Sequence, residues 1–513
     1  MPPLTQPAAA EDLVVVETAQ GKVGGRRRAG VSVFKGMRYG ADTGGANRFR
    51  PPQPLAPWTG VQDAVAYGDQ SPQMRGMLAD KGPMSEDCLR LNVWTPATDG
   101  AGRPVMLWFH GGGFEAGSAS QKVYDGTRLA LRGDVVVVSI NHRLNVYGHC
   151  YLGDRLGTAY AGSGNAGYLD LIAAMRWVRE NISAFGGDPD NVTLFGQSGG
   201  GRKVSLCYAG ADAQGLFARG IVQSGSHLRI QTPEQASRLT DALLAQLEIA
   251  PADIDKLLSV PIEALTRAQL RVMREMRSRF SPVLDGLAFT EHPFVPHAPA
   301  RSNHLPMMVG TTRTELSNQL GYEDGAFDLD MSELRRRVGR FVPTEDVDQA
   351  IATFRAASPE ATPSELYFTL ASARGYVRDA TIMAEQRVSA QAAPTYLYQL
   401  TWRSPADDGK HISQHTLDLP FMFDNVAAAL HLTGPESEET RAMANAMADT
   451  WISFARTGDP NNAAIPTWPP YDLTDRATML FEVPTRLASD PWAAEREFMS
   501  RYETQQMGRT LHR

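Results

Sequence analysis

Ser198 stands in a run of residues that suits a nucleophile. Residues 196–200 read GQSGG, a G-x-S-x-G pattern, and the apolar residues 192–195 come directly before them. Where a buried strand turns sharply into a helix, glycines on both sides of the serine let the neighbouring backbone approach closely. The turn holds the serine hydroxyl out, where it can attack a carbonyl carbon. The motif alone also fits a glycine-rich loop, but the strand before it and the helix after it favour a nucleophile.

A second glycine run suits the stabilisation of negative charge. Residues 110–114 read HGGGF and follow the apolar residues 105–109. Backbone N–H groups beside glycines are not obstructed by side chains, so they can donate to an oxygen on which negative charge develops. The alternative is a flexible turn, and the run taken alone would favour that interpretation.

The elements that must position these residues have the pattern of a wound α/β sheet. Continuous apolar runs at 105–109 and 135–140 are typical of strands buried on both faces of a mostly parallel sheet. Between and after them, helical and strand patterns alternate, which predicts helices on both faces of the sheet. We expect strands at 14–22, 31–35, 89–94, 192–195, 219–223, 307–309 and 395–402, and helices at 165–185 and 441–456.

Two long segments differ from this alternation. Residues 228–280 and 328–390 are charged and helical in pattern, and each holds a capping box, at Thr232 and Thr362. We interpret them as helical excursions that cover the carboxyl edge of the sheet. Such a cover predicts a deep pocket rather than an open groove.

The composition excludes several classes of partner. The chain has 513 residues, a net charge of -7 and three cysteines, without the clustered charge of a nucleic-acid surface or the spacing of a metal site. The first residues do not read as a signal segment and no run is long and apolar enough to cross a bilayer. We expect a cytoplasmic protein without nucleic-acid, membrane or metal partners. Residues 1–13 are predicted to be a disordered lead-in, and 14–513 a single domain.

The chain resembles the type-B carboxylesterases, the family that also contains cholinesterases, from about residue 21 to residue 481. The resemblance rests on ordered motifs: FKG at 34–36, RF at 48–49, EDCL at 86–89, the HGGGF run, FGGDP at 185–189, the serine motif, QSG at 223–225, DG at 285–286, HTLDLPFMF at 415–423, GDPN at 458–461 and WP at 468–469. It implies an α/β-hydrolase fold whose catalytic residues follow the order serine, acid, histidine.

The resemblance assigns the acid and the histidine. Glu315 ends a G-x-x-x-x-E segment at 310–315, and His415 precedes the D-L-P-F segment at 418–421. Asp285 and Glu323 are the alternative acids, and both stand in the wrong context. His411 is the alternative histidine, but it lacks the spacing and is expected at the surface.

The same resemblance implies supporting residues. It assigns the oxyanion hole to the amides of Gly112, Gly113 and Gly199. It also implies ion pairs between Arg48 and Glu86 and between Arg143 and Asp170, and it places Ser224 near the acid, as a hydrogen-bonding or a packing residue.

Several positions depart from the family pattern. Gln197 replaces its usual glutamate, and the loss of that negative charge puts any preference for cationic alcohols in doubt. Gly199 replaces its usual alanine but keeps the backbone amide, so catalysis is not in doubt. Arg38 and His149 replace a common proline and an apolar residue. Both could tune the pocket, but we expect solvated loop residues. Cys88 stands where secreted relatives form a disulfide, but the partner region at 71–75 has no cysteine, which agrees with a reducing compartment.

The sequence therefore predicts a serine carboxylesterase. Ser198 would form an acyl-enzyme with small to medium-sized esters, with His415 as base and acid, Glu315 orienting it, and no cofactor. Hydrolysis of carbamates or amides by the same triad is the alternative, and a non-catalytic binding protein is a third reading. The oligomeric state, monomer or homodimer, is left open.

Overall fold

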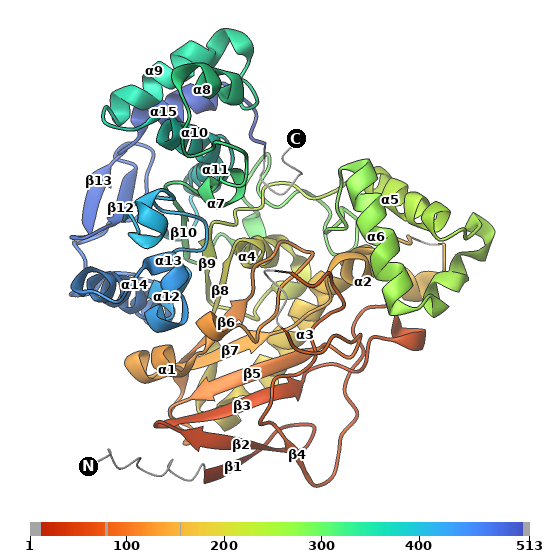
Figure 1. The fold of residues 1–513 in the computed structure, drawn as a ribbon. Coiled ribbons are helices and arrows are strands. Elements are labelled where there is room, and N and C mark those ends of the chain that lie inside the picture. Colours follow the sequence, from red (N-terminus) through yellow and green to blue (C-terminus); the bar gives the residue numbers. More distant parts are fainter. Residues whose placement is uncertain (1–11, 77–80, 154, 506–513) are drawn as a thin grey trace, which may run out of the picture.

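A computed structural model describes residues 12–76, 81–153 and 155–505. It contains a 13-stranded sheet in the order β1-β2-β3-β5-β7-β6-β8-β9-β10-β11-β12-β13, with β4 beside β2 (Figure 1). From β7 to β12 neighbouring strands are parallel. On the two flanks the strands of this order pair antiparallel, whereas β4 is parallel to β2. The central strands are β5 (Arg90–Thr95), β6 (Arg103–Phe109), β7 (Val136–Ile140), β8 (Gly187–Gln197), β9 (Arg219–Gln223), β10 (Met307–Thr312) and β11 (Thr395–Leu400). The predicted mostly parallel sheet is confirmed.

Both faces of the central sheet are covered, as its unbroken apolar strands predict. Leu107 of β6 belongs to one buried apolar cluster and its neighbour Trp108 to another, because successive side chains of a strand point to opposite faces. Helix α3 (Ala166–Asn181) supplies Met175 to the first cluster, and α14 (Glu438–Thr457) supplies Trp451 to the second. The strand that carries the serine motif is thereby held from both sides.

The N-terminal part differs from the prediction in its bounds. The structure has β1 (Asp12–Glu17), β2 (Lys22–Arg28) and β3 (Val31–Arg38), paired antiparallel in turn. The expected strand at 14–22 runs over a turn at Thr18 and Gly21, and β2, KVGGRRR, was missed because it has little apolar alternation. Most of the predicted disordered lead-in lies outside the described residues, but its last two residues belong to β1.

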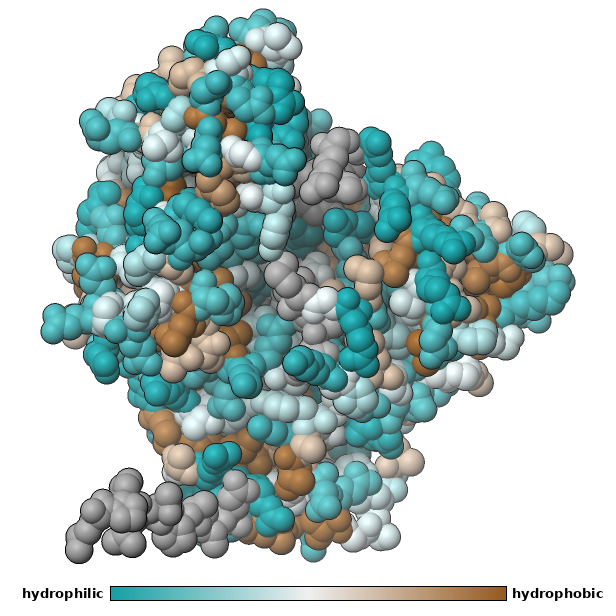
Figure 2. Space-filling model, in the orientation of Figure 1, coloured by the Kyte–Doolittle hydropathy of each residue, from teal (hydrophilic) through white to brown (hydrophobic). Residues whose placement is uncertain are grey.

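Both segments that the sequence marks as excursions are helical. The first forms α5 (Pro233–Gln246) and α6 (Ile262–Met276), and the second forms α8 (Met331–Val338), α9 (Val347–Ala357), α10 (Pro363–Ser372), a π-helix (Ala373–Val377) and α11 (Arg378–Ser389). Both predicted capping boxes are formed, at Thr232 and Thr362. Figure 1 shows the excursions on two sides of α4 (Gly199–Ala209), and Figure 2 shows them as two raised lobes with a largely hydrophilic visible surface.

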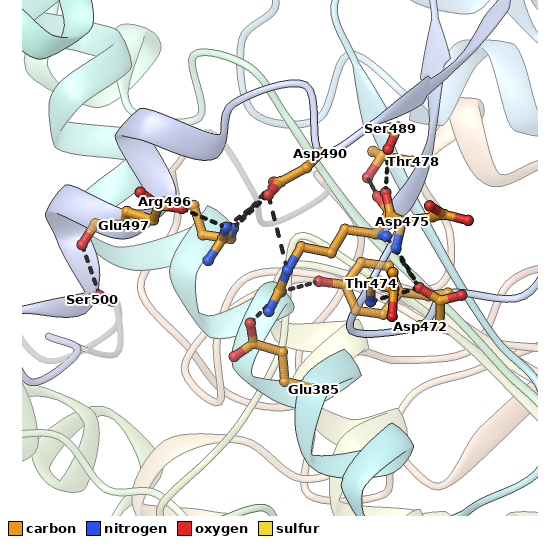
Figure 3. Close-up of polar contacts among 12 residues, drawn as sticks. Glu385, Asp472, Thr474, Asp475, Thr478, Ser489, Asp490, Arg496, Glu497 and Ser500 are labelled. Atoms are coloured by element: carbon orange, nitrogen blue, oxygen red, sulfur yellow. Dashed lines mark hydrogen bonds and ion pairs between the residues drawn. The ribbon is translucent and has the colours of Figure 1, made fainter.

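The C-terminal elements were not predicted. They are β12 (Ala477–Phe481), β13 (Arg486–Ser489) and α15 (Ala493–Ser500). Arg496 of α15 donates from Nη2 to Asp490 Oδ2 at 2.7 Å (Figure 3), and Arg476 pairs with Glu385 of α11 at 2.5 Å. These ion pairs fasten the last strands and α15 to the second excursion.

The remaining strand and α-helices of the described residues are short: β4 (Val61–Asp63), α1 (Thr127–Gly133), α2 (Asn145–His149), α7 (Ser317–Leu320), α12 (Leu419–Met422) and α13 (Leu430–Thr433). In the described part of the chain, no helix combines the length and apolar character needed to cross a membrane. That residues 14–513 form a single domain stays a prediction, which the continuous sheet supports.

Candidate active site

Ser198 lies at the turn between β8 and α4, with φ 57° and ψ −121°. A left-handed φ is uncommon for a residue with a side chain and marks a strained position. The flanking glycines make the turn possible: a Cβ on Gly196 would lie 2.4 Å from the backbone carbon of Gly200, and a Cβ on Gly200 would lie 1.9 Å from Phe109 O. The side chain of Ser198 is half-buried, so the hydroxyl is held at an accessible turn as the motif predicts.

His415 and Glu315 are brought together from distant parts of the chain. Glu315 follows β10 and is fully buried, and its Oε2 accepts a hydrogen bond from His415 Nδ1. Its other oxygen, Oε1, accepts from the Thr312 amide at 2.8 Å. Because a carboxylate oxygen can only accept, His415 carries its proton on Nδ1 and leaves the Nε2 lone pair free to take another.

The Nε2 lone pair of His415 has a partner that the sequence did not predict. Gln197 donates to it from Nε2 at 3.2 Å, and Ser198 Oγ makes no hydrogen bond to any other described residue. Gln197 therefore engages the one ring nitrogen of His415 that is free to accept a proton. The sequence marked Gln197 only as a departure from a family glutamate, and nothing in the motif indicates where its amide points.

The alternative residues are engaged elsewhere. Asp285 caps its own turn by accepting from the amides of residues 287–289. Glu323 binds Arg337 and Arg340. His411 contacts Asp407 at 3.3 Å and is partly buried rather than at the surface. Of these candidates, only Glu315 and His415 are within hydrogen-bonding distance of each other.

The glycine run forms a tight loop next to Ser198. Gly112 and Gly113 have φ of 92° and 65°, and a Cβ on Gly112 would lie 2.2 Å from Ala116 O. Gly111 O faces His110 Nδ1 at 2.8 Å, and Gly112 O accepts from two later amides. Since the C=O and N–H of a trans peptide point in opposite directions, the amides of Gly112 and Gly113 point away from these partners.

The three backbone amides assigned to the oxyanion hole are available to donate hydrogen bonds to a ligand. The N–H groups of Gly112, Gly113 and Gly199 donate to no other group in the described part of the chain. Gly113 packs directly on Gly199, because a Cβ built on Gly199 would lie 2.3 Å from Gly113 N. The arrangement places free N–H donors beside Ser198, as an oxyanion hole would require.

Both predicted ion pairs are confirmed. Arg48 binds Glu86 through Nε and Nη2 at 2.8 and 2.6 Å. Arg143 binds Asp170 through Nε and Nη2 at 2.9 and 2.6 Å, and both side chains are almost fully buried. For Ser224 the sequence left a hydrogen-bonding and a packing role open. Its amide donates to Gly310 O at 2.8 Å, but its buried Oγ has no hydrogen-bond partner among the described residues.

The expectation that His149 is a solvated loop residue is wrong. It ends helix α2, is 2% exposed, and packs edge-on against Phe114 with ring centroids 5.3 Å apart. Burial, with smaller effects from neighbouring groups, lowers its pKa to about 3, so the ring is neutral and forms part of the support of the glycine loop. Arg38 is exposed as expected, at the end of β3, where it pairs with Asp87.

Three further residues lie next to His415 or Ser198 or link to their neighbours. The ring of Tyr376 lies 5.1 Å from that of His415. Asp418 is buried, which raises its pKa to about 6, and its Oδ2 accepts from Gln223 Nε2 at 2.6 Å. Gln223 O in turn accepts from the Ser198 amide at 2.7 Å. The D-L-P-F motif marks Asp418 in the sequence. The contact of Tyr376 with His415 depends instead on how the helices of the second excursion pack against the site.

Comparisons with known proteins identify the family. The model of the carboxylesterase family matches residues 12–499. The chain belongs to the carboxylesterase family. It is 35% identical to para-nitrobenzyl esterase of Bacillus subtilis over 94% of this chain and 98% of that protein. It is also 32% identical to phenmedipham hydrolase of Pseudarthrobacter oxydans, over 91% and 94% of the two chains.

A solved carboxylesterase has the same architecture. Carboxylesterase EST55 of Geobacillus stearothermophilus matches with a TM-score of 0.83 and 38% identity, covering 94% of this chain and 99% of that one. The predicted α/β-hydrolase fold is confirmed, and the chain is a carboxylic ester hydrolase that acts on small-molecule esters. Within the described residues, no group of three or more histidine, cysteine or acidic side chains is arranged to hold a metal ion.

Proposed function

We propose that Ser198 is the nucleophile of this carboxylesterase, with His415 as its base and Glu315 as the acid that orients the base. The hydrogen bond from His415 Nδ1 to the buried Glu315 carries the proposal, because it fixes the tautomer that leaves Nε2 ready to accept a proton. The free amides of Gly112, Gly113 and Gly199 are the proposed oxyanion hole.

The reaction follows from these positions. When an ester binds, His415 Nε2 exchanges the Gln197 amide for the Ser198 hydroxyl and takes its proton as Oγ attacks the carbonyl carbon. The three glycine amides hold the resulting oxyanion. His415 then gives the proton to the leaving alcohol oxygen as the carbon–oxygen bond breaks. Water repeats the sequence on the acyl-enzyme and releases the carboxylic acid.

The first experiment measures intact mass after treatment with a fluorophosphonate, together with turnover of p-nitrophenyl acetate and hexanoate. The wild type should gain one adduct, located on the peptide that contains Ser198, and Ser198→Ala should neither label nor turn over ester. Loss of one member of such a triad typically costs about 10⁴ to 10⁶ in kcat. A wild type that labels on another serine would refute the proposal.

The chain also offers matched controls for the other two roles. His415→Gln should abolish turnover, whereas His411→Gln should leave it unchanged. Glu315→Gln should lower kcat strongly, and Glu323→Gln should affect stability alone, because Glu323 pairs with Arg337 and Arg340. Equal losses in either matched pair would show that the assignment of histidine or acid is wrong.

We propose small to medium-sized esters as substrates, which the likeness to para-nitrobenzyl esterase supports. Hydrolysis of carbamates or amides is the second candidate, and the likeness to phenmedipham hydrolase favours testing it. Matched p-nitrophenyl esters and carbamates, the corresponding anilide, and phenmedipham itself separate the two. An ester kcat/KM at least tenfold above the others supports the first candidate.

We also propose a cytoplasmic location. Cys88, Cys150 and Cys207 are free and buried, and the Ser71 side chain, not a second cysteine, contacts Cys88. Free thiols suit a reducing compartment. Fractionation of the source cells would test this location.

The oligomeric state is a separate question. Size-exclusion chromatography with light scattering would decide between monomer and homodimer.

A further inference from the structure

Lys203 is a buried lysine whose amine contacts the glycine loop of residues 110–113. It lies on α4, is 1% exposed, and donates from Nζ to His110 O at 3.0 Å and to Gly113 O at 2.9 Å. No carboxylate within the described ranges forms an ion pair with it. A lysine is rarely this buried unless its nitrogen has specific partners, and here the partners are two carbonyl groups of one loop.

The two carbonyls bracket the proposed oxyanion donors. Gly111 O and Gly112 O are already engaged within the loop, which aims the amides of Gly112 and Gly113. Lys203 takes the carbonyl on each side, His110 O and Gly113 O. Every peptide from residue 110 to residue 113 therefore has its carbonyl held, and because each peptide is planar, its N–H direction is fixed with it.

Helix α4, which begins directly after Ser198, also leaves space for this contact. Residues four apart share one face of a helix, so Gly199 and Lys203 lie on the same face of α4. A Cβ on Gly199 would lie 2.2 Å from Gly113 O, the oxygen that Lys203 binds. Because Gly199 has no side chain, the loop of residues 110–113 can contact α4 directly. The Lys203 side chain, one turn later, donates a hydrogen bond to the same loop.

Apart from the neighbouring Arg202, the groups described around Lys203 are apolar or neutral. Its Nζ lies 5.7 Å from the ring centre of Phe114, and His110 stacks on His142 with ring centroids 4.8 Å apart. Burial first, then the positive charge of Lys203, lowers the pKa of His110 to about 3 and that of His142 well below its usual range. Burial and the nearby Arg202 likewise lower the pKa of Lys203. Charged or neutral, the amine keeps enough N–H groups for both carbonyls.

We propose that Lys203 is a positioning residue for the oxyanion hole, which holds the loop of residues 110–113 on α4 so that its amides face the carbonyl oxygen of the ester. The inference rests on the proposed function of Ser198 and of the glycine amides. It assigns to Lys203 an effect on the transition state and not on substrate binding, because the oxyanion exists only after attack.

The test compares Lys203→Met with Lys203→Gln, which keeps one donor group, and with Lys256→Met, a control at an exposed lysine. Active sites are counted by fluorophosphonate labelling, and kcat and KM for p-nitrophenyl acetate are expressed per labelled site. The Ki of a trifluoromethyl ketone, whose adduct with a serine carries an oxyanion, is measured in parallel.

Lys203→Met should lower kcat per labelled site about 10- to 100-fold, somewhat less than the 10² to 10³ typical when an oxyanion donor is removed. KM should change less than threefold, and the trifluoromethyl ketone should lose affinity by the same factor as kcat/KM. Lys203→Gln should lie between this variant and the wild type, and it carries the test if Lys203→Met does not fold.

Two outcomes separate the possible failures. Lys203 variants that melt earlier but keep kcat and Ki per labelled site within twofold of the wild type would show that Lys203 has only a structural role. A wild type that fails to label on Ser198 would instead overturn the proposed function, before Lys203 is considered.

Discussion

Gln197→Glu should move the pH dependence of this carboxylesterase upward. In the structure the Gln197 amide donates to His415 Nε2 at 3.2 Å. A carboxylate at that position cannot donate, but it can accept from His415 once the ring is protonated. The substitution therefore stabilises the protonated ring, which cannot act as a base, and a higher pH is needed to restore the neutral form.

The size of the shift follows from the separation of the two groups. Two opposite unit charges 3.2 Å apart attract by about 5 kcal/mol at an effective dielectric constant of 20. Burial of the new carboxylate and the presence of Glu315 on the other ring nitrogen offset much of this. We expect the protonated ring to be stabilised by a net free energy of about 1.4 to 2.7 kcal/mol, which moves the acid limb of the kcat/KM profile up by one to two pH units.

The assay is kcat/KM for p-nitrophenyl acetate between pH 5 and pH 9.5. At pH 6 the variant should be about 10- to 100-fold slower than the wild type, and above pH 9 the two should converge. Gln197→Met is the control, because it removes the hydrogen bond without adding charge and should not move the limb upward. An acid limb of Gln197→Glu within 0.3 pH units of the wild type would refute this reading of the contact. The variant should also favour a choline ester over its uncharged isostere more than the wild type does.

Three further predictions concern the loop, one carboxyl group and one ion pair. Gly199→Ala should lower kcat at least about tenfold with little change in KM, because its Cβ would lie 2.3 Å from Gly113 N; steady-state kinetics measures both. Burial raises the pKa of Asp379 to about 7, so the folded state keeps a proton that the unfolded state loses from about pH 4, and stability falls as pH rises towards 7. Asp379→Asn should flatten this fall in urea titrations at pH 5 and pH 8, by about 1 to 3 kcal/mol. Asp170→Asn should destabilise the fold by about 3 to 5 kcal/mol in the same titration, since it leaves the buried Arg143 without its partner charge.

Each of these has an outcome that contradicts it. Unchanged kcat in Gly199→Ala would mean that the loop moves aside without losing its donors. A stability that rises between pH 5 and pH 8 equally in the wild type and in Asp379→Asn would show that this carboxyl group does not dominate the pH dependence. A loss below about 1 kcal/mol in Asp170→Asn would indicate that hydrogen bonding alone holds Arg143.

Much of the fold was predictable because its signals are local. The unbroken apolar runs of β6 and β7 require burial on both faces, and the capping boxes at Thr232 and Thr362 mark helix starts from four residues each. Strands β2, β12 and β13 were missed for the opposite reason. They are short or rich in glycine and arginine, and their pairing partners, not their own pattern, make them strands.

The site divides in the same way. The serine turn is encoded by glycines within three residues, whereas the meeting of Glu315 and His415, 100 positions apart, was predicted only through the family resemblance. His149 was misjudged because its burial results from packing against Phe114 and α3, which no local pattern reports. The contacts of Gln197 and Lys203 were missed because their side chains reach loops that are remote in sequence.

The two departures from the family pattern beside Ser198 should have separable effects. Gln197 faces His415, the proposed base, so a change there should alter the fraction of enzyme whose His415 can accept a proton, and the pH limb should move while the plateau of kcat/KM stays. Gly199 faces the loop that Lys203 holds, so a change there alters the stabilisation of the oxyanion, and the plateau falls while the limb stays. A double variant, Gln197→Glu with Gly199→Ala, should then show both changes at their single-variant sizes. Strong non-additivity would mean that base and loop share one rigid element, since independent sites contribute additively.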